Sequence, residues 1–265
     1  MWVGQQLADG LDFWGFLGSL ILGGIILGIY TGLLGYVGAK TGLSLDLLSQ
    51  RAFGEKGSYL PSAMTSFTQI GWFGVGSFVS GGTATPNFAR FAKNGKAGAI
   101  TTVVAFFIGN SLMFFFGAVS SIFVGGNDIF EVMVRLNLFY LAVLVLGLNI
   151  WTTNDNALYT AGLGLANIFH QRKKPMVLLS GIIGTVASVW LYYNFCGWLN
   201  ILNCTLPPVG MILVLAYFMN KEDFETDQPK LKTVDWFAVA GVILGAIVAN
   251  LLHLSLIHIS EPTRP

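Results

Sequence analysis

Seven long apolar segments dominate this sequence, and their length decides what the chain can fold into. Each is at least as long as the roughly 20 residues that a helix needs to cross the hydrocarbon core of a bilayer. Backbone polar groups inside a bilayer must be satisfied within the segment itself, so we expect all seven to be helices. The segments cover residues 12–38, 59–89, 97–125, 136–166, 175–195, 198–219 and 234–254.

Composition supports the same class. Only 10% of the 265 residues are charged and 54% are hydrophobic, whereas soluble domains carry about 25% charged residues. A soluble enzyme and a disordered chain are therefore excluded. The 14 basic and 13 acidic residues leave a net charge of +1, which indicates no nucleic acid partner. The predicted fold class is an all-α polytopic membrane protein.

Two of the segments are expected to be irregular. Residues 59–89 contain several glycines among many Ser and Thr residues. This segment is either a discontinuous helix that lines a cavity or not one natural helix. Residues 198–219 contain Pro207 and Pro208, which should break or restart a helix at that point.

The basic residues between the segments predict an orientation. Loops 90–96, 170–174 and 221–235 each carry three basic residues, while 127–135 carries one and 196–198 none. This alternation places the first three loops in the cytoplasm. Loop 39–58 also carries three basic residues, yet only segment 59–89 separates it from loop 90–96. Either that segment enters and returns, or an odd number of spans is missing from it.

The first candidate binding residues are Gln69 and Trp72. They are three residues apart and share one face of a helix. An indole provides a flat π-surface and an amide provides a donor and an acceptor, so the pair suits a planar ligand such as a nucleobase. The alternative is a Trp at the membrane interface and a Gln that bonds to a neighbouring helix.

The second candidate is the polar stretch 148–156, inside an otherwise apolar segment. Polar residues within a membrane are expensive and are functional candidates. Four of them recur at i, i+3, i+4 and i+7, which is one stripe of a helix, and their neutral oxygens suit Na⁺. Asn154 lies about 140° round the helix from Asn149 and suits a substrate. Asp155 either carries a proton or bonds to a neighbouring helix. The alternative for the whole stretch is that its polar side chains join helices. The stripe consists of Asn149, Thr152, Thr153 and Asn156.

Several stretches resemble the nucleobase:cation symporter family, and the resemblance covers nearly all of residues 1–253. They are residues 28–31, 35–43, 68–76, 107–114 and 146–159. The resemblance implies a leucine-transporter-type inverted-repeat fold of about twelve helices, with discontinuous first and sixth helices. It also implies a monomer in the bacterial inner membrane that imports cytosine with Na⁺ by alternating access. No cofactor beyond this coupling ion is implied.

The resemblance also assigns roles to individual residues. Trp72 stacks on the pyrimidine and Gln69 bonds its edge. Ser77 and Phe78 match the unwound point of the family's sixth helix, where backbone and ring contact substrate. The remaining matches lie on the eighth helix. They are Asn149 and Asn154 as lining residues of the substrate site, and Asn149, Thr152 and Thr153 at the Na⁺ site.

The chain also departs from the family pattern. The family places the Trp72 stretch in its third helix and the Ser77 stretch in its sixth, whereas here they are adjacent. We therefore expect an internal deletion between Gly76 and Ser77. Residues 1–76 become the remnant of the first repeat (the end of helix 1, helix 2 and the start of helix 3). Residues 77–220 become the second repeat, and 221–253 a loop and helix 11.

Residues 254–265 resemble the translation of a sequencing-library adapter and are set aside. With half of the first repeat missing, we expect transport by this polypeptide to be absent or badly impaired. Two alternatives remain for the function: a transporter of another planar heterocycle, such as a purine or hydantoin, and a non-functional fragment of such a permease. An enzyme is not expected, because the spans contain no nucleophile–base pair.

Overall fold

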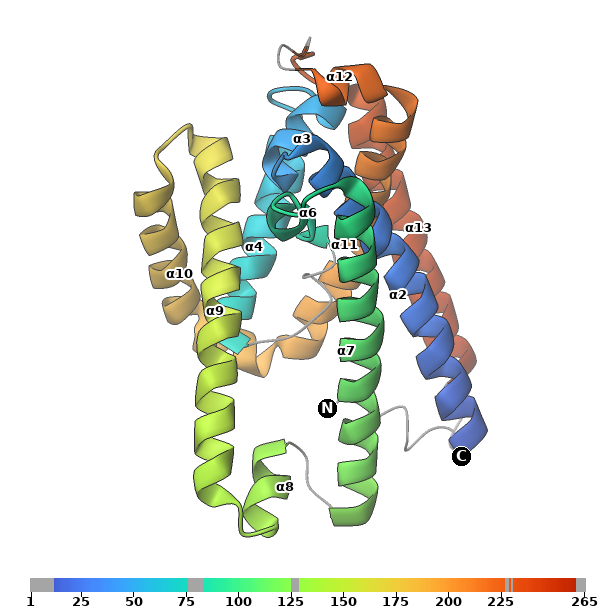
Figure 1. Cartoon of the computed structure of the whole chain (residues 1–265), viewed down its shortest axis with the longest axis vertical. Helices are drawn as coiled ribbons and strands as arrows, with labels where there is room; N and C mark the ends of the chain where they lie inside the picture. The colour runs from blue at the N-terminus through green and yellow to red at the C-terminus, as the bar shows by residue number, and fades with distance from the viewer. Residues whose placement is uncertain (1–11, 76–82, 125–128, 227–228, 230, 261–265) are drawn as a thin grey trace.

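The computed structural model describes residues 12–75, 83–124, 129–226, 229 and 231–260, and its elements there are helices (Figure 1). Four are short: α3 (Leu45–Phe53), α6 (Pro86–Ala89), α8 (Ile129–Arg135) and α12 (Lys221–Glu225). The long helices are α2 (Phe13–Thr41), α4 (Tyr59–Val75), α7 (Gly95–Val124), α9 (Phe139–Phe169), α10 (Lys173–Tyr193), α11 (Phe195–Met219) and α13 (Trp236–Ser260).

Among the described residues, 4 helical stretches are long and apolar enough to cross a membrane. They are Phe13–Thr41, Gly95–Val124, Lys173–Leu191 and Ile201–Met219, and Trp236–Leu252 is a shorter apolar helix. Large apolar side chains point outward on these helices, as on Val186 and Phe237, which suits contact with lipid. The prediction of a polytopic helical membrane protein is confirmed.

The segment predicted at 59–89 is not one helix. Helix α4 ends at Val75, and the chain is next described at Thr83, just before α6. This agrees with the expectation that the segment is interrupted. The expected joint between Gly76 and Ser77 lies outside the described residues.

The predicted break at Pro207 and Pro208 is wrong, because α11 runs through both. Pro208 packs against Gly245 of α13, where an added β-carbon would lie 2.9 Å from the proline Cγ. This contact between α11 and α13 accommodates the proline ring. Membrane helices tolerate proline where neighbouring groups satisfy the backbone groups that the proline leaves without a hydrogen bond. Helix α11 also begins at Phe195, so residues 196–198 form its first turn and not a loop. Helix α13 extends over residues 254–260 of the tail that was set aside.

Helices α2 and α7 pack closely along a row of glycines. An added β-carbon at Gly35 would lie 3.1 Å from the carbonyl oxygen of Gly98. One at Gly28 would lie 3.7 Å from Val103 Cγ1. Small residues that let two backbones approach are typical of membrane helix pairs. Gly28 and Gly35 lie in two of the stretches that carry the family resemblance.

The four basic loops lie at one end of the molecule, called here the basic end, and α8 lies at the other (Figure 1). Leu45 N–H donates to Asn87 Oδ1 at 2.8 Å, which joins α3 to α6. Glu55 N–H donates to Lys232 O at 2.7 Å. Tyr59 Oη lies 3.4 Å from His170 Nε2. The described residues of these loops therefore group at one end, and α6 lies at the same end as the start of α4.

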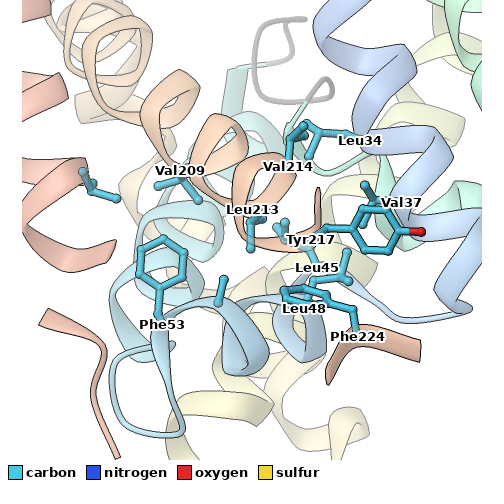
Figure 2. Packing of buried hydrophobic residues seen from close by; sticks show 12 residues of the cluster. Leu34, Val37, Leu45, Leu48, Phe53, Val209, Leu213, Val214, Tyr217 and Phe224 are labelled. Atoms are coloured by element: carbon cyan, nitrogen blue, oxygen red, sulfur yellow. The ribbon is translucent and has the colours of Figure 1, made fainter. Parts of the chain in front are cut away.

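A hydrophobic core fills the basic end between α2, α3, α11 and α12 (Figure 2). Helix α3 starts at an N-cap, where Ser44 Oγ accepts from Leu47 N–H at 3.5 Å. Tyr217 is buried there and donates its hydroxyl to Glu225 Oε1 at 2.8 Å. This core holds α3 against the helix ends. The buried residues drawn and labelled are Leu34, Val37, Leu45, Leu48, Phe53, Val209, Leu213, Val214, Tyr217 and Phe224.

Candidate functional site

Helices α4 and α9 pack antiparallel, and this pairing positions the predicted site. Ser66 Oγ donates to Ala161 O at 3.2 Å. An added β-carbon at Gly164 would lie 2.8 Å from Ser62 O. Asn167 Nδ2 donates to Ser62 Oγ at 2.9 Å. As residue numbers rise on α4 they fall on α9, which gives the register of the pair.

This register brings two predicted site residues to the same level. Asn154 is seven residues from Ala161 and Trp72 is six from Ser66, so both lie about 10 Å farther along the pair. Asn154 is half-buried. Trp72 is on α4, but its side chain is outside the described part of the structure. Ser77 and Phe78 also lie outside the described residues.

Gln69 is buried on α4, one turn before Trp72. Between them, Gly71 faces the indole of Trp198 on α11, where an added β-carbon would lie 2.9 Å from Cη2. Trp198 is itself buried. The sequence places Trp198 in a loop and does not single it out. Its burial closes one side of the α4 surface that carries Gln69.

The predicted Na⁺ ligands lie farther along α9. Thr153 Oγ1 donates to Asn149 Oδ1 at 3.1 Å. Thr152 Oγ1 donates to the carbonyl oxygens of Leu148 and Asn149, each at 3.1 Å. These neutral oxygens fit the chemistry of a hard cation. The contacts described for the stripe are all within α9, so it supplies one side of a cation site.

The outer part of this polar stretch is exposed. Asn149, Thr152, Asp155 and Asn156 are exposed on α9, and Thr153 is partly buried. In a helix of this length, exposed amide and carboxylate groups would face lipid, which is unfavourable. The described helices therefore leave a polar face uncovered. We call the exposed residues Asn149, Thr152, Asp155 and Asn156 the α9 polar face.

The structure reveals a second polar cluster that the sequence did not predict. Ser62 donates to Asp46 Oδ1 at 2.6 Å. Asn167 Nδ2 donates to Ser58 Oγ at 3.1 Å, and Gln50 Nε2 donates to Asn167 Oδ1 at 2.6 Å. We call these five residues the basic-end cluster. It joins α3, α4 and α9 where α4 begins.

Asp46 is the only carboxyl group in the basic-end cluster, and it is 5% exposed. Burial raises the pKa of this carboxyl to about 6, while the Ser62 hydroxyl and the Arg90 charge act in the opposite direction. Helix α3 lies outside the membrane-spanning helices. The charges of loop 39–58 indicate a segment in water, but its residues Leu45, Leu48 and Phe53 repeat at helical spacing. That pattern is the signal that could have predicted α3 and placed Asp46 beside its buried face.

The sequence is similar to known permeases. The profile of the family described as permease for cytosine/purines, uracil, thiamine, allantoin matches residues 1–84 and 74–259. The cytosine permease of Escherichia coli (strain K12) is 36% identical over 343 residues, covering 95% of this chain and 82% of the relative. The allantoin permease of Bacillus subtilis (strain 168) is 34% identical over 82 residues, covering 31% of this chain and 16% of the relative.

The alignment with the Escherichia coli permease is longer than the chain. It runs over 343 positions, whereas the chain has 265 residues. The relative therefore contains residues within this span that have no counterpart here. The two profile matches meet and overlap at 74–84, around the undescribed segment between α4 and α6.

Proposed function

This chain belongs to the family of permeases for cytosine/purines, uracil, thiamine and allantoin, and from that premise we propose that its site is a cytosine site. The substrate lies between α4 and α9, and import is coupled to Na⁺ by alternating access. The protein is a transporter and not an enzyme. The observation that carries the proposal is the antiparallel packing of α4 and α9, which brings Asn154 level with Trp72.

The residue chemistry supports a planar, amide-like substrate. Trp72 offers a ring for stacking, and an offset aromatic stack contributes about 1 kcal/mol beyond burial. Gln69 and Asn154 both offer a donor and an acceptor, which is what the ring nitrogen, carbonyl and amino group of cytosine require. Gln69 is buried, so bonds that it makes to a substrate are shielded from water. In this proposal Ser77 and Phe78 contact the substrate from the remaining side of the site.

Sodium is the coupling ion in this proposal. Asn149 and Thr153 hold their oxygens 3.1 Å apart, and Thr152 lies on the adjacent position of the same turn. Bound Na⁺ would take lone pairs from these oxygens in place of the present hydroxyl hydrogen bonds and draw in further carbonyl ligands. Because Asn149 and Asn154 are on one helix, the cation and the substrate would order the same segment of α9. That shared segment is the physical link between the two binding steps.

We also propose that the chain carries an internal deletion at Gly76 and Ser77. Two observations support it: the relative's additional residues in the aligned span and the uncovered α9 polar face. The absent helices would cover that face. Transport needs two repeats that move against each other, so we expect this chain to bind cytosine weakly and to transport it poorly.

Binding is tested first, on the purified chain in detergent. We expect radiolabelled cytosine to bind, and Asn154→Ala to weaken binding about tenfold, because one lost bond to a buried polar group is worth on the order of 1–2 kcal/mol. Gln69→Met, which keeps the side-chain volume, should weaken cytosine binding by a similar factor. Asn250→Ala on α13 is the matched control, since the bond described for its amide is to Ala246 O of its own helix. Equal loss in all three variants would contradict the site.

Transport and specificity are tested separately. Uptake of labelled cytosine into a permease-null strain, with and without Na⁺, measures coupling. Uptake above background would refute the expected impairment, and uptake independent of Na⁺ would refute the coupling ion. Competition by purines and hydantoins distinguishes the ligand class. If a purine displaces labelled cytosine at a lower concentration than unlabelled cytosine does, the site prefers another heterocycle.

A further inference from the structure

A cluster of cations at the basic end remains outside the proposed transport site. Arg90 follows α6 and donates from Nη2 to the hydroxyl of Tyr159 on α9. Lys173, at the start of α10, places Nζ 3.5 Å from the centroid of the same phenol ring. Two cations from separate segments therefore meet on one aromatic side chain. We call Arg90, Lys173 and Tyr159 the cation pair site.

The charge around the cation pair site is unbalanced. Loops 90–96 and 170–174 each hold three basic residues and no acidic one, whereas 39–58 and 221–235 mix both signs. Of the ion pairs described in the structure, none includes Arg90 or Lys173. The Arg90 charge lowers the pKa of the Asp46 carboxyl, but Asp46 Oδ1 already accepts a hydrogen bond from the Ser62 hydroxyl. Two like charges at one phenol repel each other, and an anion between them would remove that repulsion.

Two side-chain donors of the segment 87–90 are also without a hydrogen-bond partner in the described part of the chain. Arg90 Nε and Asn87 Nδ2 are buried and have no hydrogen-bond partner among the described residues. Asn87 is fully buried, and its Oδ1 is already used by Leu45 N–H. Buried donors without partners are rare in proteins and each needs an explanation. A ligand that brings several acceptor oxygens would provide one.

Apolar aromatic groups frame the same place. Phe91 is 75% exposed and Phe88 is 42% exposed. The Arg90 guanidinium lies 4.7 Å from the Phe91 ring centroid, and the rings of Phe88 and Tyr159 are 6.2 Å apart. Exposed aromatics next to basic residues at a helix end are typical of the headgroup region of a membrane.

We propose that the cation pair site binds the phosphate of an anionic phospholipid from the leaflet at the basic end. Arg90 and Lys173 contact the phosphate oxygens from two sides, and the acyl chains lie against Phe88 and Phe91. Basic pockets between membrane helices on the cytoplasmic side are a recognised form of lipid site. The lipid would tie α6 to α9 and α10, because the two cations come from different segments.

The test is thermal unfolding of the purified chain in detergent, titrated with phosphatidylglycerol, phosphatidylcholine or inorganic phosphate. We expect phosphatidylglycerol to raise the midpoint more than phosphatidylcholine does. The double variant R90Q/K173Q should weaken the apparent affinity about 25-fold and K173Q alone about fivefold, at roughly one tenfold step per 1.4 kcal/mol and 1 kcal/mol per cation. Lys173→Gln leaves the Arg90 bond to Tyr159 intact, so it remains informative if the double variant does not fold.

The control is the double variant K56Q/K221Q, which removes the same charge at the same end. Lys221 also lies over an aromatic ring, 5.3 Å from the centroid of Phe218. Retained phosphatidylglycerol affinity in this control, with loss in R90Q/K173Q, supports the site. Equal loss in both would show general electrostatic attraction and overturn it. An equal effect of inorganic phosphate would make the ligand a free anion and also overturn it, as would equal effects of the two lipids.

Discussion

The basic-end cluster and the α9 polar face contain the same kinds of residue in opposite situations. In the cluster, Asn167 bonds to side chains of both α3 and α4. On the polar face, the described bonds of Thr152 and Asn149 are all within α9. Asn167 and Thr152 lie on the same helix, α9. The difference is that the described helices surround Asn167 and leave Thr152 exposed.

This contrast separates what holds the chain together from what it would use in transport. Polar groups that are fully paired between helices stabilise one arrangement of those helices. Polar groups that bond only locally keep their oxygens available to a substrate or ion. Substitutions in the cluster should therefore act on stability, and those on the polar face should act on binding.

The largest effect is expected at Gly164. A β-carbon there would collide with Ser66 Oγ and lie 2.8 Å from Ser62 O, so Gly164→Ala should lower stability by about 3 kcal/mol through forced separation of α4 and α9. The measurement is unfolding in detergent. Gly147→Ala on the same helix meets nothing within 4 Å and should be neutral or stabilising. Equal behaviour of the two would refute the close packing.

Removing the amide at the centre of the cluster comes next. Asn167→Ala leaves the partly buried amide of Gln50 and the buried hydroxyl of Ser62 without a bond that they now make. We expect a loss of about 2 kcal/mol in unfolding free energy. Asn250→Ala, at an exposed asparagine, should change it by less than about 0.5 kcal/mol. A small change at Asn167 would mean that the cluster does not join the helices.

The pH dependence of stability tests Asp46. Its pKa in the folded chain, about 6, lies above the ordinary value of 3.8 because the carboxyl is buried. The folded state therefore holds the proton more tightly, and stability should rise as pH falls from 7 through 6 and level off below 3.8. The gain is about 3 kcal/mol for a shift of about two units at roughly 1.4 kcal/mol per unit.

Asp46→Asn separates this effect from that of the other titrating groups of the chain. The variant keeps an oxygen that can accept the Ser62 hydroxyl, but it has no proton to gain in this range. Its stability should change less than that of the parent chain between pH 7 and 4. Parallel curves for the two proteins would show that Asp46 does not titrate in this window.

The smallest effect on stability is expected on the α9 polar face. The Thr152 hydroxyl is exposed and bonds only to its own helix, so Thr152→Ala should change stability by less than about 0.5 kcal/mol. It should nevertheless reduce the enhancement of cytosine binding by Na⁺. Thr185→Ala on α10 is matched, because that hydroxyl also bonds back within its helix. A stability loss at Thr152 alone would indicate a structural role.

Hydropathy predicted most of the long helices, because bilayer thickness imposes a length that is visible in the sequence. The segment predicted from hydropathy, 59–89, continues past Val75 because the composition stays apolar, whereas α4 ends at Val75. The rule that proline breaks a helix failed at Pro208 because it considers one helix alone. Pro208 packs against Gly245, which belongs to α13.

The candidate site was predictable in its residue types and not in its environment. Gln69, Trp72 and Asn154 stood out as polar or aromatic groups in apolar segments. The burial of Trp198 against Gly71 could not be predicted, because it depends on how α11 returns beneath α4. Asp46 was overlooked because its loop carries mixed charges, and only contact with α4 reveals that it is buried. Local composition does not show such long-range partners.

The backbone bonds between residues 53–57 and 232–235 have a consequence for synthesis. Glu55 and Lys56 donate to Lys232 O and Thr233 O, at 2.7 and 2.8 Å, and Asp235 donates to Phe53 O at 2.6 Å. At about 5–20 residues per second, a ribosome needs on the order of 10 to 35 seconds to reach the second partner after making the first. During that interval water at the membrane surface must satisfy the waiting amides. Closure of the basic end is therefore among the last events in the biogenesis of this chain.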